Sequence, residues 1–153
     1  MDALSSRRWA PHVTVATVVC RAGQVLLVEE EKDGRRVLNQ PAGHLDPGES
    51  LVEAAVRETR EETGWEVRPT AFIGTYQWNA PDGTPFLRFA FAAEPLRHHP
   101  DQALDSGIVQ ALWLTPAALQ ADMARLRSPL VWQTVSDWLA GQRHPLSILR
   151  QVP

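Results

Sequence analysis

Residues 43–65 constrain this chain more than any other stretch, because a glycine-containing loop there runs into a segment with strong helix signals. Ser50 is a favourable N-cap, and Glu53 three residues later completes the pattern of a capping box. Gly64 stands where a left-handed C-terminal cap is expected. Together these signals predict a helix from Leu51 to Thr63.

The predicted helix carries three carboxylates on one face. At about 100° per residue, Glu58, Glu61 and Glu62 fall within roughly 100° of one another. Like charges three or four positions apart destabilise a helix, and Arg57 alone cannot neutralise all three. Hard divalent cations bind carboxylate oxygens, and Mg²⁺ is commonly held by carboxylates together with substrate phosphates. The pattern therefore indicates either a solvated acidic face or a metal site.

The side of this helix that is expected to pack on the core consists of small and branched residues. Ala54 and Ala55 lie beside the carboxylates and leave room for a ligand to approach. Glu53 and Arg60 are expected to point to solvent. The predicted buried stripe comprises Val52, Ala55, Val56, Thr59 and Thr63.

The whole stretch fits the pattern G-x5-E-x7-R-E-U-x-E-E-x-G-U, in which U is apolar. The matching residues are Gly43, Glu49, Arg57, Glu58, Glu61, Glu62 and Gly64. This pattern resembles the Nudix box, the signature of hydrolases that act on nucleoside diphosphates linked to another group. Thr59 departs from it, because the family prefers an aliphatic residue there, and residues 41–44 read Pro-Ala-Gly-His where many members have Pro-Gly-Gly. The resemblance favours the metal site over the solvated face.

The rest of the chain predicts an α/β (α+β) fold with a mixed sheet and helices on both faces, which is the α/β/α sandwich that the Nudix resemblance implies. Residues 30–36 and 95–105 are interpreted as loops, with a short extended piece at residues 37–38. Helices are expected after Thr115 and over residues 129–140. The predicted strands are residues 12–20, 24–29, 71–78, 86–93 and 108–114.

Composition favours a single domain over residues 1–153, with residues 1–10 flexible and residues 142–153 docking on the body. Apolar content of 44% and charged content of 22% are ordinary for a globular protein. A net charge of -3 gives no excess of positive charge for binding nucleic acid. No apolar run is long enough to span a membrane. With no signal-peptide pattern and only Cys20 as a thiol, we expect a cytoplasmic protein. We expect a monomer, with a dimer as the alternative.

Segments outside the box resemble the NudJ-type phosphatase subfamily, which extends the resemblance to nearly the whole chain. The resemblance implies Mg²⁺-dependent release of terminal phosphate from nucleoside tri- and diphosphates, with Mn²⁺ as the alternative metal. It also implies action on hydroxymethylpyrimidine pyrophosphate and thiamine pyrophosphate. The alternatives are a Nudix enzyme for ADP-ribose or oxidised nucleotides, and a catalytically silent Nudix sensor. The segments are residues 11–16, 40–45, 77–78, 80–82, 84–89, 127–131 and 141–146.

By the same resemblance, the metal site is built from the box. Glu58 and Glu62 are the main ligands, and Glu61 is a third ligand or a water contact. The carbonyl of Gly43 completes the site.

The resemblance also assigns catalytic roles. Arg57 orients a box carboxylate, and Glu49 either pairs with Arg57 or approaches the metal through water. The general base is a box glutamate, Glu61 or Glu62, and Asp105 before the last strand is the alternative.

Four residues are candidates for substrate binding, each with a structural alternative. Arg88 interrupts an apolar run and either holds a phosphate or points to solvent. Trp78 and Tyr76 share one strand face and either stack on a base or pack in the core. His44 either points into the cleft or makes a structural hydrogen bond. Arg35 and Arg36 are interpreted as solvated loop charges, with a phosphate contact as the alternative.

Overall fold

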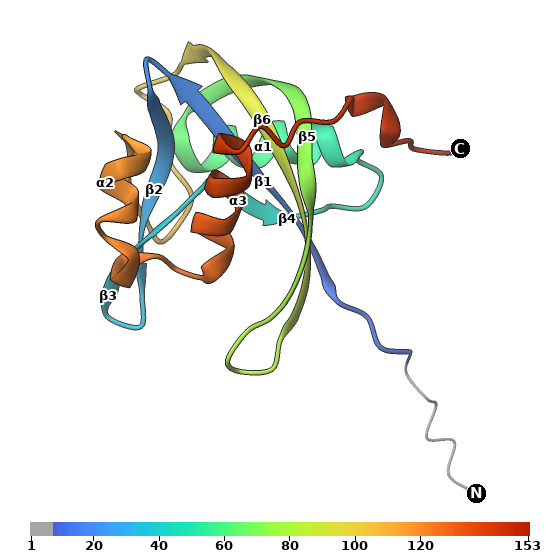
Figure 1. The fold of residues 1–153 in the computed structure, drawn as a ribbon, viewed down its shortest axis with the longest axis horizontal. Coiled ribbons are helices and arrows are strands. Elements are labelled where there is room, and N and C mark those ends of the chain that lie inside the picture. Colours follow the sequence, from blue (N-terminus) through green and yellow to red (C-terminus); the bar gives the residue numbers. More distant parts are fainter. Residues whose placement is uncertain (1–7) are drawn as a thin grey trace, which may run out of the picture.

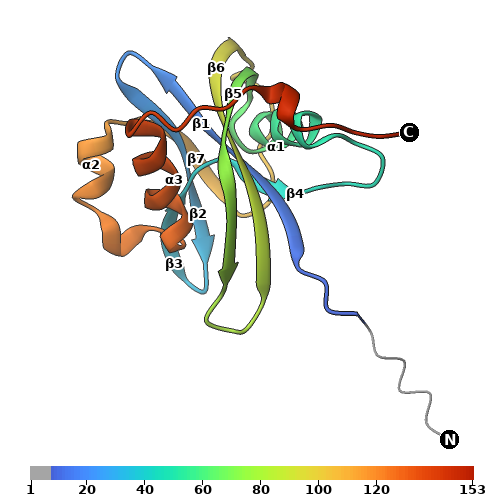
Figure 2. The same ribbon diagram turned by 45° about the vertical axis from the view of Figure 1, so that its right-hand side comes forward.

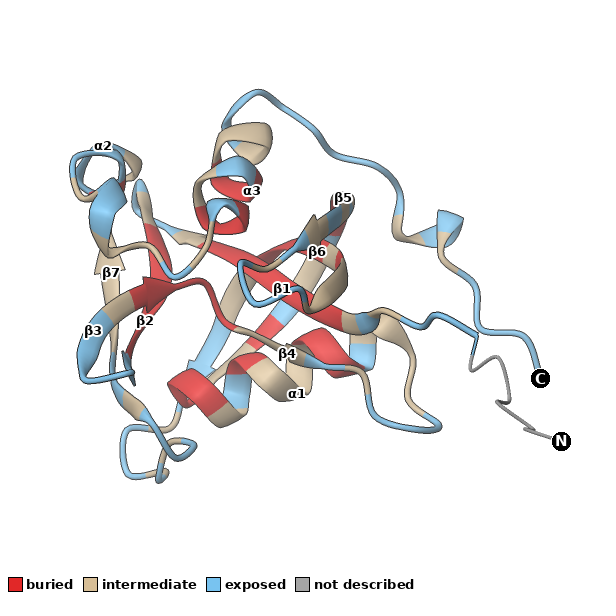
Figure 3. Ribbon diagram, turned by 90° about the horizontal axis from the view of Figure 1, so that it is seen from below, coloured by how far each residue is buried: buried red, intermediate tan, exposed pale blue. Residues whose placement is uncertain are grey.

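The computed structural model describes residues 8–153 and places a mixed sheet between two helical layers, with α1 on one side and α2 and α3 on the other (Figures 1 and 3). This confirms the predicted fold class. The predicted flexibility of residues 1–10 falls largely on residues 1–7, which lie outside the described residues. The helices are α1 (Leu51–Thr63), α2 (Pro116–Gln120) and α3 (Pro129–Leu139), with 3₁₀ turns η1 (Met123–Arg125) and η2 (Leu146–Ile148). The strands are β1 (His12–Arg21), β2 (Gln24–Lys32), β3 (Arg35–Asn39), β4 (Ala42–His44), β5 (Trp65–Asn79), β6 (Pro85–His98) and β7 (Ile108–Leu114).

The strands follow the order β3-β2-β1-β6-β5, with β4 also paired to β1 and β7 to β2. Strands β1 and β6 are parallel, and the other pairs are antiparallel. Successive side chains of a strand point to opposite faces, so β1 contributes to two cores. Val15 packs with Phe91 and Ala55 on the α1 side. Val18 packs with Val131 on the α3 side.

Strands β2, β3, β5 and β6 are longer than the local pattern predicts, so the predicted loops at residues 30–36 and 95–105 are wrong in part. Strand β2 continues to Lys32, and β3 begins at Arg35. Strand β5 begins at Trp65, and β6 continues to His98. The two form a long ribbon, and its hairpin end reaches past the other strands (Figure 2). Irregularities in their pairing accommodate Pro69 and Pro95. Proline is tolerated at edges and bulges, because no ladder hydrogen bond is lost there.

The acidic helix has the predicted bounds. Ser50 accepts a hydrogen bond from the Glu53 amide at 3.1 Å, and Gly64 adopts φ 74° as the C-terminal cap. The Glu53 carboxylate makes no return bond to Ser50 among residues 8–153. The hydroxyl of Thr59 is fully buried, lies 2.8 Å from the Thr17 hydroxyl and donates to the Ala55 carbonyl, which explains why threonine is accommodated at this position.

The buried face observed for α1 differs from the predicted stripe by about one residue position. Ala54 is fully buried in the core, whereas Val52 and Val56 are only partly buried. Ala54 therefore belongs to the packing face and leaves no space for a ligand. The observed buried face includes Glu62, which the predicted stripe did not.

The C-terminal segment contacts the α1 side of the fold. His144 exchanges two backbone hydrogen bonds with Phe72 on β5, at 2.8 and 2.9 Å. Leu146 and Leu149 pack against the core beneath α1. Within residues 8–153, no helix combines the length and the apolar character needed to cross a bilayer.

Candidate active site

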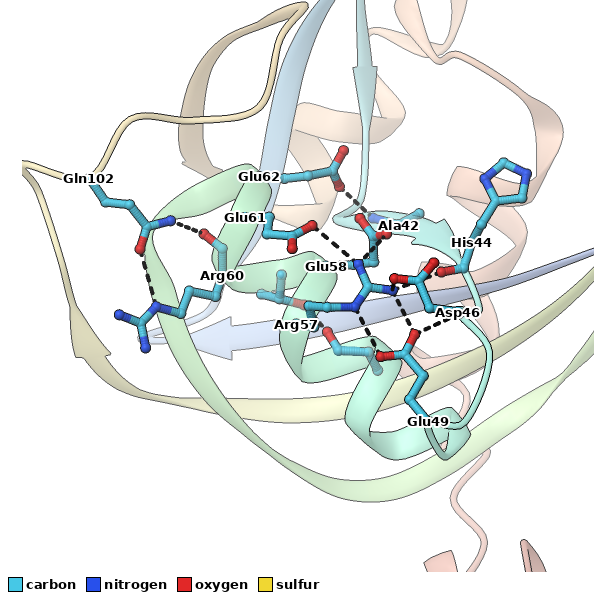
Figure 4. A network of polar contacts seen from close by, with 12 residues as sticks. Ala42, His44, Asp46, Glu49, Arg57, Glu58, Arg60, Glu61, Glu62 and Gln102 are labelled. Atoms are coloured by element: carbon cyan, nitrogen blue, oxygen red, sulfur yellow. Dashed lines mark hydrogen bonds and ion pairs between the residues drawn. The ribbon is translucent and has the colours of Figure 1, made fainter. Parts of the chain in front are cut away.

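Arg57 is the hub of the polar network that joins α1 to the preceding loop (Figure 4). Its Nε and Nη2 donate to the two Glu49 oxygens at 2.9 and 2.6 Å. Nη2 also donates to the His44 carbonyl at 2.9 Å, and Nη1 donates to Glu58 at 2.9 Å and to Glu61 at 3.2 Å. The paired guanidinium holds the pKa of Glu49 below its usual range. Of the two alternatives for Glu49, the structure contains the pairing with Arg57.

Arg57→Ala is expected to destabilise the metal-free protein by about 1–3 kcal/mol, because the Glu49 and Glu58 side chains, 15% and 13% exposed, would lose their charged donor. Arg57→Lys should recover part of this loss, since an ammonium keeps the charge without the planar fork. Thermal melts of both variants in chelator, beside the exposed-pair variant Arg68→Ala, test the expectation. Equal melting temperatures for Arg57→Ala and Arg68→Ala would contradict it.

Three carboxylates from two segments converge beside Arg57. One oxygen each of Glu58, Glu61 and Asp105 lie within 4.8 Å of one another. Asp105 belongs to the loop before β7, where its amide donates to the Glu61 carbonyl at 3.1 Å. Burial raises the pKa of Glu58, Arg57 opposes this rise, and Glu61 and Asp105 add to it. A cluster of acidic oxygens that repel one another is the donor set of a hard divalent cation, so the residues fit such an ion.

Glu62 is not part of this cluster, although the helical wheel groups it with Glu58 and Glu61. Its side chain is buried, and Oε1 accepts a hydrogen bond from the Ala42 amide at 2.7 Å. Burial raises the pKa of Glu62 to about 8, and the charges of Glu30, Glu58 and Asp105 add to this rise. Glu62 is therefore oriented by β4 and is more deeply buried than the other two helix glutamates.

Gly43 is required by close approach, because a Cβ atom at this position would overlap the Glu58 carboxyl group. The overlapping group is the end of a flexible side chain, so a substitution would displace the carboxylate and leave the backbone in place.

Gly43→Ala is expected to lower turnover by about 10²-fold with little loss of stability, because small displacements of catalytic groups are costly for the rate. The matched control is Gly23→Ala, where φ is 77° and the space is open, so that stability should fall while activity is kept. Steady-state rates and melts of both variants test this expectation. A Gly43→Ala protein with normal turnover would contradict it.

A cavity of about 770 Å³ opens next to this cluster, with Gly43 on its wall. Its lining includes the Trp78 ring, which stacks on Phe86 with centroids 5.7 Å apart. Arg88 and His44 also line it. A ligand with a flat ring and an anionic group matches this lining.

Arg88 is buried on β6 and lines the cavity, so the alternative of outward exposure is wrong. Its Nε lies 3.4 Å from the Thr14 hydroxyl, and its Nη1 has no hydrogen-bond partner among the described residues. Burial, assisted by the charge of Arg127, lowers the pKa of Arg88 to about 10. The guanidinium is thus charged at neutral pH and has a free donor.

Of the other residues considered for substrate binding, some line the cavity and some do not. Tyr76 does not line the cavity, because its hydroxyl donates to Asp137 on α3 at 2.7 Å. His44 lines the cavity, and its Nε2 lies 3.1 Å from Nδ1 of His12. Burial lowers the pKa of His44, and the charge of His12 adds to this effect. Arg36 is a strand residue 3.5 Å from Glu29, outside the cavity lining.

Sequence reasoning assigned no role to Asn39 and Arg127, which line the cavity, or to Gln40 beside Asn39. Asn39 and Gln40 are buried at the end of β3, and Asn39 Oδ1 and both side-chain polar atoms of Gln40 lack partners. Arg127 lines the cavity from the segment before α3. Gln40 and Arg127 each begin a segment that resembles the NudJ-type subfamily, residues 40–45 and 127–131, but the resemblance gave neither residue a role.

Comparison with known proteins agrees with this geometry. The family model for the NUDIX domain matches residues 10–133. The chain is 50% identical over 140 residues to the phosphatase NudJ of Escherichia coli K12 and to that of Shigella flexneri, covering 91% of this chain and 90% of each relative. It is also 44% identical to a NUDIX hydrolase of known structure from Nitrosomonas europaea, with a TM-score of 0.91 over 94% of this chain and 98% of that one. The chain therefore belongs to the NUDIX family and is a hydrolase of phosphoric anhydrides.

Proposed function

We propose that this hydrolase releases the terminal phosphate of nucleoside tri- and diphosphates and of pyrimidine pyrophosphates, including hydroxymethylpyrimidine pyrophosphate and thiamine pyrophosphate, with Mg²⁺. The observation that carries the proposal is the buried Nη1 of Arg88, which has no partner among the described residues and belongs to a cavity that shares Gly43 with the Glu58 side of the acidic cluster. The 50% identity to phosphatase NudJ supports it.

In this proposal the four acidic groups divide into ligands and a base. Glu58, Glu61 and Asp105 are the residues that would hold a divalent cation, and the Gly43 carbonyl would complete the set. Such a cation supplies Lewis acidity and neutralises charge on the phosphates when it is bound. Glu49 acts through Arg57, which holds Glu58 and Glu61 in place.

We assign the general base to Glu62. A base works best when its pKa lies near the operating pH, and burial brings the pKa of Glu62 to about 8. The Ala42 amide fixes one carboxylate oxygen, so the carboxylate has a defined orientation. Asp105, the alternative base, is instead assigned to the cation.

Two parts of the cavity lining hold the substrate. Arg88 donates to the outer phosphate, because a buried guanidinium gains strong charge-assisted hydrogen bonds from an anion. Trp78, stacked on Phe86, offers a face for the base or pyrimidine ring. His44 lines the same cavity. Tyr76 is assigned to packing against α3.

Product analysis tests the proposed function. With a nucleoside triphosphate and Mg²⁺, we expect inorganic phosphate and the nucleoside diphosphate as the first products. Pyrophosphate with the monophosphate would contradict it, as would preferred cleavage of ADP-ribose or of an oxidised nucleotide in the same panel. Binding without turnover would indicate a ligand sensor.

A further inference from the structure

Arg127 shares the cavity with Arg88 but has no role in the box or in the reaction described above. The positive charge of Arg127 lowers the pKa of Arg88, so the two guanidinium groups lie close enough to repel each other. Two cations that repel each other in the free protein gain most from an anion that both contact. Two arginines from different segments therefore line one cavity.

The backbone and the side chain of Arg127 are both anchored. Its amide donates to the Leu38 carbonyl at 2.9 Å, and the adjacent Leu126 forms a bridge with Leu38. Its Nη1 is paired with Glu30 on β2. Within residues 8–153, its Nε and Nη2 make no hydrogen bond, so part of the guanidinium fork is available to a ligand.

Arg125 provides a structural comparison within the same segment. It pairs with Glu29, the residue before Glu30, at 2.6 Å. The exposures of the two arginine side chains are similar, 38% for Arg125 and 41% for Arg127. Only Arg127 lines the cavity. Two arginines thus fasten this segment to β2, and one of them also presents donors to the site.

We infer that Arg127 is a second phosphate-binding residue and that it forms a two-arginine subsite with Arg88. This subsite selects a free terminal phosphate over a phosphate that carries an ester group on its outer side. The inference rests on the proposed function. A terminal phosphate carries about two negative charges at neutral pH, because its second pKa is about 6. An outer ester removes one of these charges and one acceptor oxygen. The second arginine therefore favours substrates that end in a free phosphate.

The test is a binding comparison in chelator, where turnover is absent. The probes are a nucleoside diphosphate and the same molecule carrying a methyl ester on its outer phosphate, titrated by calorimetry. We expect the wild-type protein to bind the free diphosphate at least tenfold more tightly. Arg127→Ala should reduce this preference about tenfold or more, since a hydrogen bond to a charged group changes the binding affinity by about this factor. Arg127→Lys should retain part of the preference.

Arg125→Ala is the matched control, because it breaks the neighbouring pair outside the cavity and should keep the wild-type preference. If Arg127→Ala does not fold, the double variant Glu30→Gln/Arg127→Gln removes both charges of the pair and should show the same loss. Equal binding of the two probes by the wild-type protein would overturn the inference. A preserved preference in either folded variant that lacks Arg127 would also overturn it.

The two proposals fail separately. Release of pyrophosphate from a triphosphate would contradict the proposed function even if the two probes are discriminated. Loss of discrimination would contradict the two-arginine subsite even if inorganic phosphate is the product.

Discussion

Replacing Glu62 by glutamine is expected to lower turnover at least about 10²-fold, because the proton acceptor is lost while the Ala42 amide keeps an oxygen acceptor. The same change is expected to make the metal-free protein more stable at pH 8. A folded Glu62→Gln protein with a near-normal rate would remove the base assignment. Steady-state rates at saturating substrate and Mg²⁺ are the measurement.

The stability gain follows from the raised pKa of Glu62, about 8 in the folded protein against an ordinary value of 4.5. Between these values the unfolded chain ionises this group while the folded protein keeps it protonated. The folded state therefore binds more protons, and stability falls as pH rises through this window. Glutamine does not titrate, so the advantage of the variant should grow from about pH 5 to about pH 8, by roughly 1–3 kcal/mol. Melts in chelator at both pH values test this, and an advantage that is constant with pH would contradict it.

Removal of divalent cations is expected to abolish hydrolysis and to leave the protein folded. The three clustered carboxylates fit a cation, whereas the two main cores are built from apolar side chains of the sheet and helices. Excess chelator should therefore eliminate phosphate release, and added Mg²⁺ or Mn²⁺ should restore it. Melting curves with and without chelator provide the control. Full activity in excess chelator would remove the roles given to Glu58, Glu61 and Asp105.

At limiting Mg²⁺ the rate is expected to rise from about pH 6 toward about pH 9, because protons compete with the cation for carboxylates. Burial raises the pKa of Glu58 in the metal-free protein, which strengthens this competition. Saturating Mg²⁺ should weaken the dependence. Phosphate release across this range at two Mg²⁺ concentrations is the measurement, and an identical profile at both would contradict the explanation.

The local parts of the site were predictable because they depend on short-range geometry. Capping residues and a 3.6-residue period place Glu58 and Glu61 on one helix, and both bounds of that helix are confirmed. The box pattern identified the family correctly, since its residues serve one loop and one helix. The pairing of Glu49 with Arg57 belongs to the same local unit.

Contacts between distant segments were decided by the tertiary structure alone. Asp105 joins the acidic cluster because the loop before β7 is hydrogen-bonded to the end of α1, which no local pattern encodes. Glu62 leaves the cluster because β4 offers it an amide. Arg88 and Arg127 meet in one cavity because β6 and the segment before α3 border the same space. Helix periodicity specifies which side chains share a face, but only packing between elements specifies which polar atoms are buried, paired or left free for a ligand.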